Sequence, residues 1–132
     1  MPKNNILDSQ NNISENNLDE EFQLKIDEET LIKSENINIK FLDVIEDSRC
    51  SADANCVWPG QVIISINISK DNKDFGNFNL NTSIDTVEYF DQFSIEFIKI
   101  DPYRMYMMKE INKADYIATF IIKQNKSTEN NI

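Results

Sequence analysis

Apolar and polar residues alternate with a period of two along much of this chain. The clearest stretch is QVIISINIS, residues 61–69, where Val62, Ile64, Ile66 and Ile68 share one face. Successive side chains of a β-strand point to opposite faces, so this pattern indicates a strand with one buried face. The same alternation, rich in β-branched and aromatic residues, predicts further strands at residues 22–26, 37–45, 78–80, 93–100 and 115–123.

The spacing of these segments favours an all-β fold. Turn-like residues separate them, which is typical of an antiparallel β-sandwich (immunoglobulin-like) or a small barrel of about seven strands. Residues 85–92 fit either a strand or a helical turn, and residues 103–114 fit a loop with a helical turn. We expect one domain at residues 21–124, between a disordered leader at 1–20 and a disordered tail at 125–132, both too polar to pack.

The charge balance argues against several classes of partner. The chain has 13 basic and 23 acidic residues, a net charge of −10, which disfavours nucleic acid and anionic membrane surfaces. No run approaches the roughly 20 apolar residues of a spanning helix, so no membrane insertion is expected. A cation, a basic protein surface or solubility alone fits the acidity.

Both cysteines and the tryptophan fall in one stretch, DSRCSADANCVWPG, at residues 47–60. Cys50 and Cys56 are spaced to form a disulfide across a tight loop. Two reduced core cysteines are an alternative. A metal site is a poorer fit, because structural zinc needs four ligands and the chain has no histidine.

A disulfide would fix the shape of the enclosed segment, the candidate binding loop Ser51, Ala52, Asp53, Ala54 and Asn55. Trp58 would cover the bridge, and Pro59-Gly60 would supply a turn before the next strand. Arg49 would hold the loop by pairing with Asp47 or Asp53, or would remain a solvated charge.

The stretch FLDVIEDSRCSADANCVWPGQVIIS resembles the signature of a family of small, uncharacterised prokaryotic β-domain proteins, often exported or lipid-anchored. The matching positions are Asp47, Ser48, Arg49, Cys50, Cys56, Trp58 and Gly60, and Ser51 and Pro59 depart from the usual proline and alanine. The resemblance extends weakly over residues 21–124, with EFQLKIDEETLI as the opening strand pair. It implies a compact β domain in an oxidising compartment and implies no reaction.

Catalytic and metal chemistry find little support. The chain has no histidine and no Gly-x-Ser-x-Gly elbow, and bridged cysteines are not nucleophiles, so we do not expect an enzyme. We expect no cofactor; calcium is the alternative, at Asp71, Asp74 and Asn77. These residues do not match the helical calcium-loop pattern, and a hairpin turn explains them equally well.

A second candidate contact lies near residue 105, where large tyrosine and methionine side chains crowd together without a strand period. Such a soft patch suits protein contact, or alternatively a loop that plugs one end of the barrel. Its members are Tyr103, Met105, Tyr106, Met107 and Met108.

Together these features favour a non-enzymatic binding module that presents the disulfide-closed loop to a partner protein. One form of this hypothesis is an inhibitor-like protein. The alternatives are an acidic decoy of a nucleic-acid-binding surface and a calcium-dependent surface domain. A disulfide favours an exported or cell-surface location. The first residues lack the apolar segment of a signal peptide, which favours the cytoplasm instead. No feature indicates an oligomeric state.

Overall fold

The computed structural model describes residues 13–50, 57, 59–103 and 111–125, and over these ranges the chain is all β. Its elements in chain order are β1 (Ile13–Asn16), β2 (Phe22–Lys25), β3 (Glu29–Ile32), β4 (Ile37–Asp47), β5 (Val62–Lys70), β6 (Lys73–Asn81), β7 (Val87–Phe90), β8 (Phe93–Asp101), the 3-10 helix η1 (Lys113–Asp115) and β9 (Ile117–Gln124). Within these ranges no helix has the length and apolar character needed to cross a membrane.

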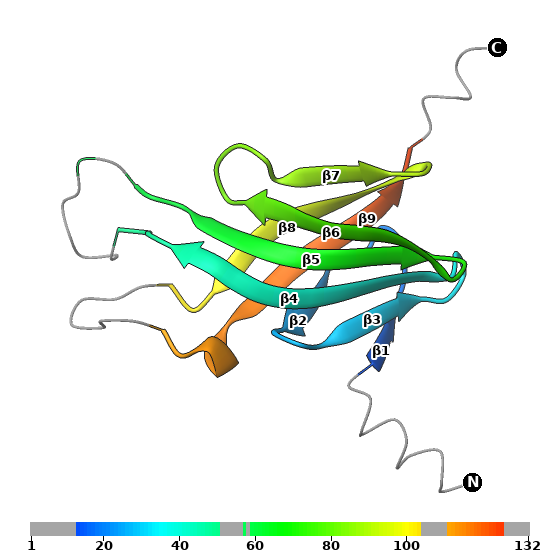
Figure 1. Ribbon diagram of the computed structural model, residues 1–132, viewed down its shortest axis with the longest axis horizontal. Coiled ribbons are helices and arrows are strands. Elements are labelled where there is room, and N and C mark those ends of the chain that lie inside the picture. Colours follow the sequence, from blue (N-terminus) through cyan, green and yellow to red (C-terminus); the bar gives the residue numbers. More distant parts are fainter. Residues whose placement is uncertain (1–12, 51–56, 58, 104–110, 126–132) are drawn as a thin grey trace, which may run out of the picture.

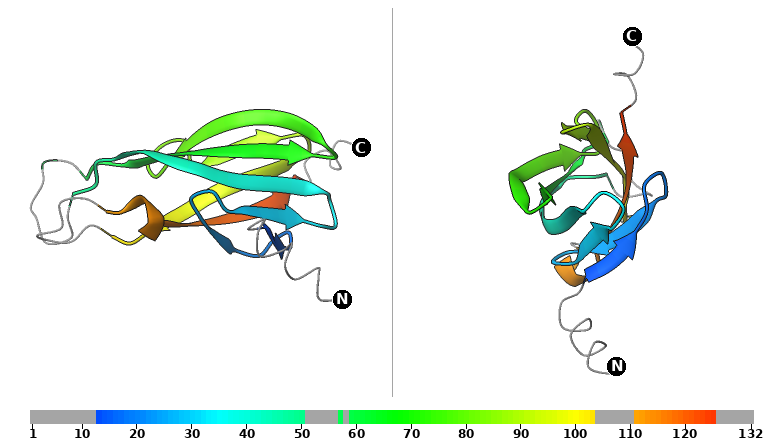
Figure 2. Two further views of the ribbon diagram at one scale, coloured as in Figure 1. Left: turned by 60° about the horizontal axis from the view of Figure 1, so that its bottom comes forward. Right: turned by 90° about the vertical axis from the view of Figure 1, so that its right-hand side faces the viewer.

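The strands form two sheets packed face to face (Figures 1 and 2). One sheet has the order β1-β3-β4-β5-β6, and the other has the order β2-β9-β8-β7. All pairs are antiparallel except β1 with β3, which is parallel. The predicted antiparallel sandwich is therefore confirmed, and the barrel alternative is wrong because neither sheet closes on itself.

The core lies between the sheets and is made by the apolar face that the period-two pattern predicts. Along β5, Val62, Ile64, Ile66 and Ile68 are completely buried. Phe120 of β9 lies at the centre, with its ring centroid 5.7 to 6.3 Å from the rings of Phe22, Phe41 and Phe97. Because Phe41 belongs to the five-stranded sheet and the others to the four-stranded sheet, these rings join the two layers.

Several boundaries differ from the predictions. The described residues contain nine strands rather than about seven, and residues 85–92 contain the strand β7. The leader expected at residues 1–20 is wrong in its last part, because β1 pairs with β3 from Ile13 onwards. Asn16 explains this pairing, since its amide donates to the hydroxyl of the buried Thr30 at 2.7 Å. Residues 1–12 and 126–132 lie outside the described residues.

The two ends of the sandwich differ in character. At one end the turns are short, and Asn36, Asp71, Asn72 and Asp91 adopt positive φ, as asparagine and aspartate do more readily than other non-glycine residues. At the other end β4, β6 and β8 finish and β5 and β9 begin (Figure 1). We name this second end the loop end and define it by residues 43–50, 57, 59–62, 81–86, 100–103 and 111–117.

Candidate binding surface at the loop end

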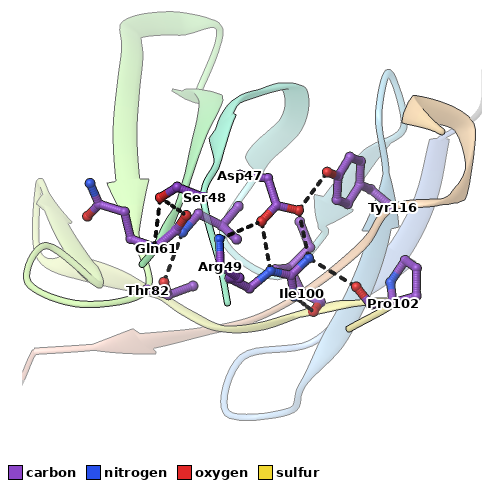
Figure 3. Close-up of polar contacts among 9 residues, drawn as sticks. Asp47, Ser48, Arg49, Gln61, Thr82, Ile100, Pro102 and Tyr116 are labelled. Atoms are coloured by element: carbon purple, nitrogen blue, oxygen red, sulfur yellow. Dashed lines mark hydrogen bonds and ion pairs between the residues drawn. The ribbon is translucent and has the colours of Figure 1, made fainter. Parts of the chain in front are cut away.

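Arg49 lies at the centre of a polar network at the loop end (Figure 3). Its Nε donates to Asp47 Oδ1 at 2.9 Å, and its Nη2 donates to Asp47 Oδ2 at 2.8 Å. Only 9% of the Arg49 side chain and 10% of the Asp47 side chain are exposed. Arg49 is therefore a buried bidentate partner of Asp47, and the solvated-charge alternative is wrong. The other candidate partner, Asp53, lies outside the described residues.

The guanidinium of Arg49 also binds a segment more than fifty residues away in sequence. Its Nη1 donates to the carbonyl of Ile100 at 3.2 Å, and its Nη2 donates to the carbonyl of Pro102 at 3.0 Å. The ring of Tyr103 lies 5.5 Å from the Arg49 Cζ, which adds a cation–π contact. Arg49 thereby joins the segment after β4 to the segment after β8.

A third segment reaches Asp47 from the start of β9. The hydroxyl of Tyr116, whose side chain is buried, donates to Asp47 Oδ2 at 2.8 Å. Burial raises the pKa of Asp47, but the hydrogen bonds from Arg49 and Tyr116, together with the Arg49 charge, outweigh burial and hold that pKa below its ordinary value. Asp47 is thus an ionised carboxylate at neutral pH, and it anchors three segments.

The base of the segment between β4 and β5 is closed by backbone contacts. The Ser48 N–H donates to the carbonyl of Gln61 at 2.8 Å, and the Cys50 N–H donates to the carbonyl of Pro59 at 3.0 Å. Gly60 has φ of +76°, and a Cβ atom there would lie 1.9 Å from the carbonyl oxygen of Ser48. Gly60 therefore fits the base of this loop, because only glycine allows the two chain segments to approach so closely.

The loop between β6 and β7 joins the same surface, although none of its residues is among the predicted site residues. Thr82 and Val62 exchange two hydrogen bonds of 3.1 Å, and the Ser83 hydroxyl donates to Gln61 Oε1 at 3.1 Å. The side chain of Asn81 caps this loop by accepting the N–H groups of Ser83 and Ile84. The available signal was the run Asn-Thr-Ser directly after an alternating segment, because these side chains favour local turns.

Lys113 is a further residue that sequence reasoning missed. From η1, its Nζ donates to Asp43 Oδ1 at 2.7 Å and to the carbonyl of Val44 at 2.8 Å. This contact attaches the chain just before β9 to β4. Together with Arg49 it fixes both sides of the segment between β8 and β9 to the neighbouring sheet.

The loop end also displays apolar side chains to solvent. Four of the seven exposed large hydrophobic residues in the described ranges lie here, on four different segments: Ile45, Val57, Ile84 and Tyr103. Ile84 is 80% exposed, and within its loop its N–H donates to Asn81 Oδ1 at 2.7 Å. Exposed apolar side chains that gather at one end of a molecule can mark a contact surface.

The predicted site residues divide into two groups. Asp47, Arg49, Cys50, Gly60 and Tyr103 lie at the loop end as described above. The remainder lie outside the described residues: Ser51, Ala52, Asp53, Ala54, Asn55, Cys56, Trp58, Met105, Tyr106, Met107 and Met108. Cys50 is not a free thiol, whereas its bridge to Cys56 remains a prediction.

The candidate calcium ligands lie at the opposite end, in and after the turn between β5 and β6. Asp74 Oδ1 accepts the N–H of Gly76 at 2.8 Å and the amide of Asn67 at 3.0 Å, and Asp71 binds Lys70 and Asn36. No group of three or more histidine, cysteine or acidic residues in the described ranges is arranged to hold a metal ion. The contacts of Asp71 and Asp74 fit the hairpin-turn interpretation, and calcium binding remains untested.

No family model, curated protein or solved structure matches this chain. The resemblance to the exported β-domain family therefore stays a prediction.

Proposed function

We propose that this chain is a non-enzymatic β-sandwich binding module that contacts a partner protein through its loop end. One observation carries the proposal: Arg49 binds both Asp47 and the carbonyls of Ile100 and Pro102. The candidate binding loop, residues 51–55, begins two residues after Arg49. The tyrosine and methionine patch begins at Tyr103, whose ring Arg49 contacts. Two segments identified independently from the sequence thus start from one joined base.

The surroundings of this base support a contact surface. Ile45, Val57 and Ile84 add exposed apolar area, and interfaces commonly place aromatic and aliphatic side chains at their centre. The base is rigid because its polar groups are paired and half-buried or buried. A loop that is already ordered loses less conformational entropy on binding, so rigidity favours affinity.

The proposal includes a disulfide between Cys50 and Cys56 and, with it, an oxidising compartment outside the cytoplasm. Intact-mass measurement after alkylation, with and without prior reduction, tests this part. A bridged protein takes up two alkyl groups only after reduction. Uptake of both alkyl groups without reduction would show that the cysteines are not bridged, and the argument for export would then fail.

Affinity capture from an extract of the source organism tests the function. The bait is the full chain, compared with Ile84→Ser at the loop end and with the control Tyr89→Ser, which removes an exposed apolar side chain from β7. The proposal expects the partner recovered by the wild type to fall about tenfold with Ile84→Ser and to persist with Tyr89→Ser. Equal recovery by both variants contradicts a contact at the loop end.

Two conditions separate the alternatives in the same capture. An acidic decoy would lose its partner steeply as salt rises, whereas an apolar contact keeps it. A calcium-dependent domain would need added calcium for capture, and its thermal midpoint would rise with calcium by mass action. Recovery that resists salt and ignores calcium supports the loop-end contact.

A further inference from the structure

The edge strand β2 has backbone groups that no strand of its sheet can bind. β2 is the end strand of the four-stranded sheet and pairs on one side with β9. The N–H of Lys25 donates to Glu28 Oε1 at 2.9 Å, and the carbonyl of Lys25 accepts the N–H of Glu28. Both backbone groups of Lys25 therefore point away from β9. Because alternate residues of a strand point the same way, the N–H and carbonyl of Gln23 also face outward.

A groove follows this open edge, and we name it the β1–β2 groove. Its larger part, about 500 Å³, lies between Ser14–Asn16 of β1 and Glu21–Gln23 at the start of β2, with Thr119 also lining it. A smaller part of about 180 Å³ continues along Leu24 and Lys25 and shares Gln23 with the first. The groove thus borders β2, the end strand of its sheet, and also reaches Thr119 and Ile117 of the paired strand β9. An added strand would lie along the free side of β2.

The residues around the groove are mainly acidic. Between residues 13 and 29 the chain has seven acidic residues and one lysine, so this short region holds more than half of the net charge of −10. None of these seven carboxylates forms an ion pair within the ranges that the structure describes. Glu15 and Glu21 line the groove and are exposed. A basic partner would therefore find unpaired carboxylates on both walls.

We propose that the β1–β2 groove binds an extended basic segment of a partner protein, which adds as a strand to the free edge of β2. Its backbone pairs with the N–H and carbonyl of Gln23. Alternate side chains of the added strand point outward, toward the face where Glu21 and Gln23 lie, and these positions suit lysine or arginine. The other side chains point toward the buried Phe22 and Leu24, and these positions suit small apolar residues.

A second copy of this chain is the less favoured occupant. Two copies carry the same seven carboxylates in this region, and bringing them together would cost electrostatic repulsion. A basic segment would instead be attracted by the same carboxylates. Of the residues that line the groove, only Ile117 also belongs to the loop end. The variants that test the two contacts change other residues, so the two proposals can fail independently.

The probe is a synthetic peptide of alternating lysine and valine, titrated against the full chain and followed by fluorescence anisotropy. We compare the wild type with Glu15→Gln/Glu21→Gln in the groove. The matched control is Glu96→Gln/Asp91→Asn, which makes the same charge change at two exposed positions outside both the groove and the loop end. The groove variant should bind about tenfold more weakly, and the control should bind as the wild type does.

Backbone pairing is tested separately from charge. The same peptide with every backbone nitrogen methylated keeps its lysines but cannot pair as a strand, so its binding should be lost. Hydrogen exchange of the Gln23 amide should slow when the unmethylated peptide binds. The amide of Asn79, on β6 at one edge of the five-stranded sheet, should exchange at its original rate.

Four results would overturn the proposal. Equal affinity for the methylated peptide would mean attraction by charge alone. Equal weakening by the control variant would place the peptide elsewhere on the acidic surface. Slowed exchange at Asn79 as well as at Gln23 would show that the peptide does not prefer the edge of β2. A dimer of the free protein held together at Gln23 would show that a second copy, rather than a basic segment, occupies this edge.

Discussion

Arg49 and Asp47 show how two polar residues, separated by one position in the sequence, organise the loop end. The pair is largely buried, and its remaining hydrogen-bonding groups are satisfied by Tyr116, Ile100 and Pro102. A buried ion pair is stable only when such additional partners are present, because both charges lose their hydration. The sequence could predict Asp47 as a partner because it lies two residues from Arg49. It could not predict Tyr116, which is 69 residues away and arrives only through the β8–β9 hairpin.

The lowered pKa of Asp47 predicts how stability depends on pH. Because the folded state favours the carboxylate, this group stabilises the fold at neutral pH, and the stabilisation is lost as pH falls through the lowered pKa. Asp47→Asn should therefore reduce the free energy of unfolding by about 2 kcal/mol at pH 7. The difference from the wild type should shrink as the pH is lowered to about 2.

Urea unfolding at several pH values measures this prediction. Asp91→Asn is the control, because Asp91 is a half-exposed aspartate 3.7 Å from Lys70 at the opposite end, and asparagine tolerates its positive φ. The control should follow the wild-type pH profile. A constant difference between Asp47→Asn and the wild type at all pH values would contradict the ionised role of Asp47.

At the scale of elements, the strands that the alternation predicts are those with a continuous apolar face. β4, β5, β8 and β9 each bury alternate residues, so local pattern and tertiary packing agree. β1 is mostly polar and its one apolar residue, Ile13, is exposed, so it gives no such pattern. It is held by parallel pairing with β3, a long-range contact that no local signal reveals. The first half of β6 was missed for a related reason, because Phe75 is an extra residue in a bulge that breaks the period.

β9 is the strand whose packing should matter most to stability. It lies between β2 and β8, and Phe120 at its centre contacts rings from both sheets. Phe120→Ala should lower the free energy of unfolding by about 4 kcal/mol, because a large cavity would open between the layers. Tyr89→Ala on the edge strand β7, where the side chain is 66% exposed, should change it by less than about 1 kcal/mol. Thermal and urea unfolding of the two variants measure the difference, and similar losses would place the centre of the core elsewhere.

At the scale of the whole molecule, one core joins both sheets while the candidate surfaces lie at its margins. Buried residues from β2, β4, β5, β8 and β9 form a single cluster, so the sandwich should unfold as one cooperative unit. The loop end is attached to this unit by the Arg49 network and by Lys113, and the β1–β2 groove lies along its open edge. Substitutions in either surface can therefore alter binding without unfolding the β-sandwich.

This separation makes a prediction about the proposed Cys50–Cys56 disulfide. Reducing it should lower the free energy of unfolding by about 2 kcal/mol, because so short a loop restricts the unfolded chain only modestly. Hydrogen exchange should accelerate at Cys50 and Val57, since Cys50 forms one side of the bridge and Val57 directly follows Cys56. Exchange in the middle of β5, at Ile66, should change only by the global amount, because its hydrogen bonds to β4 and β6 do not involve the loop. Urea unfolding and exchange with and without reductant measure both effects. Complete unfolding on reduction would contradict this picture, since it would mean that the crosslink, rather than the packed sheets, maintains the fold.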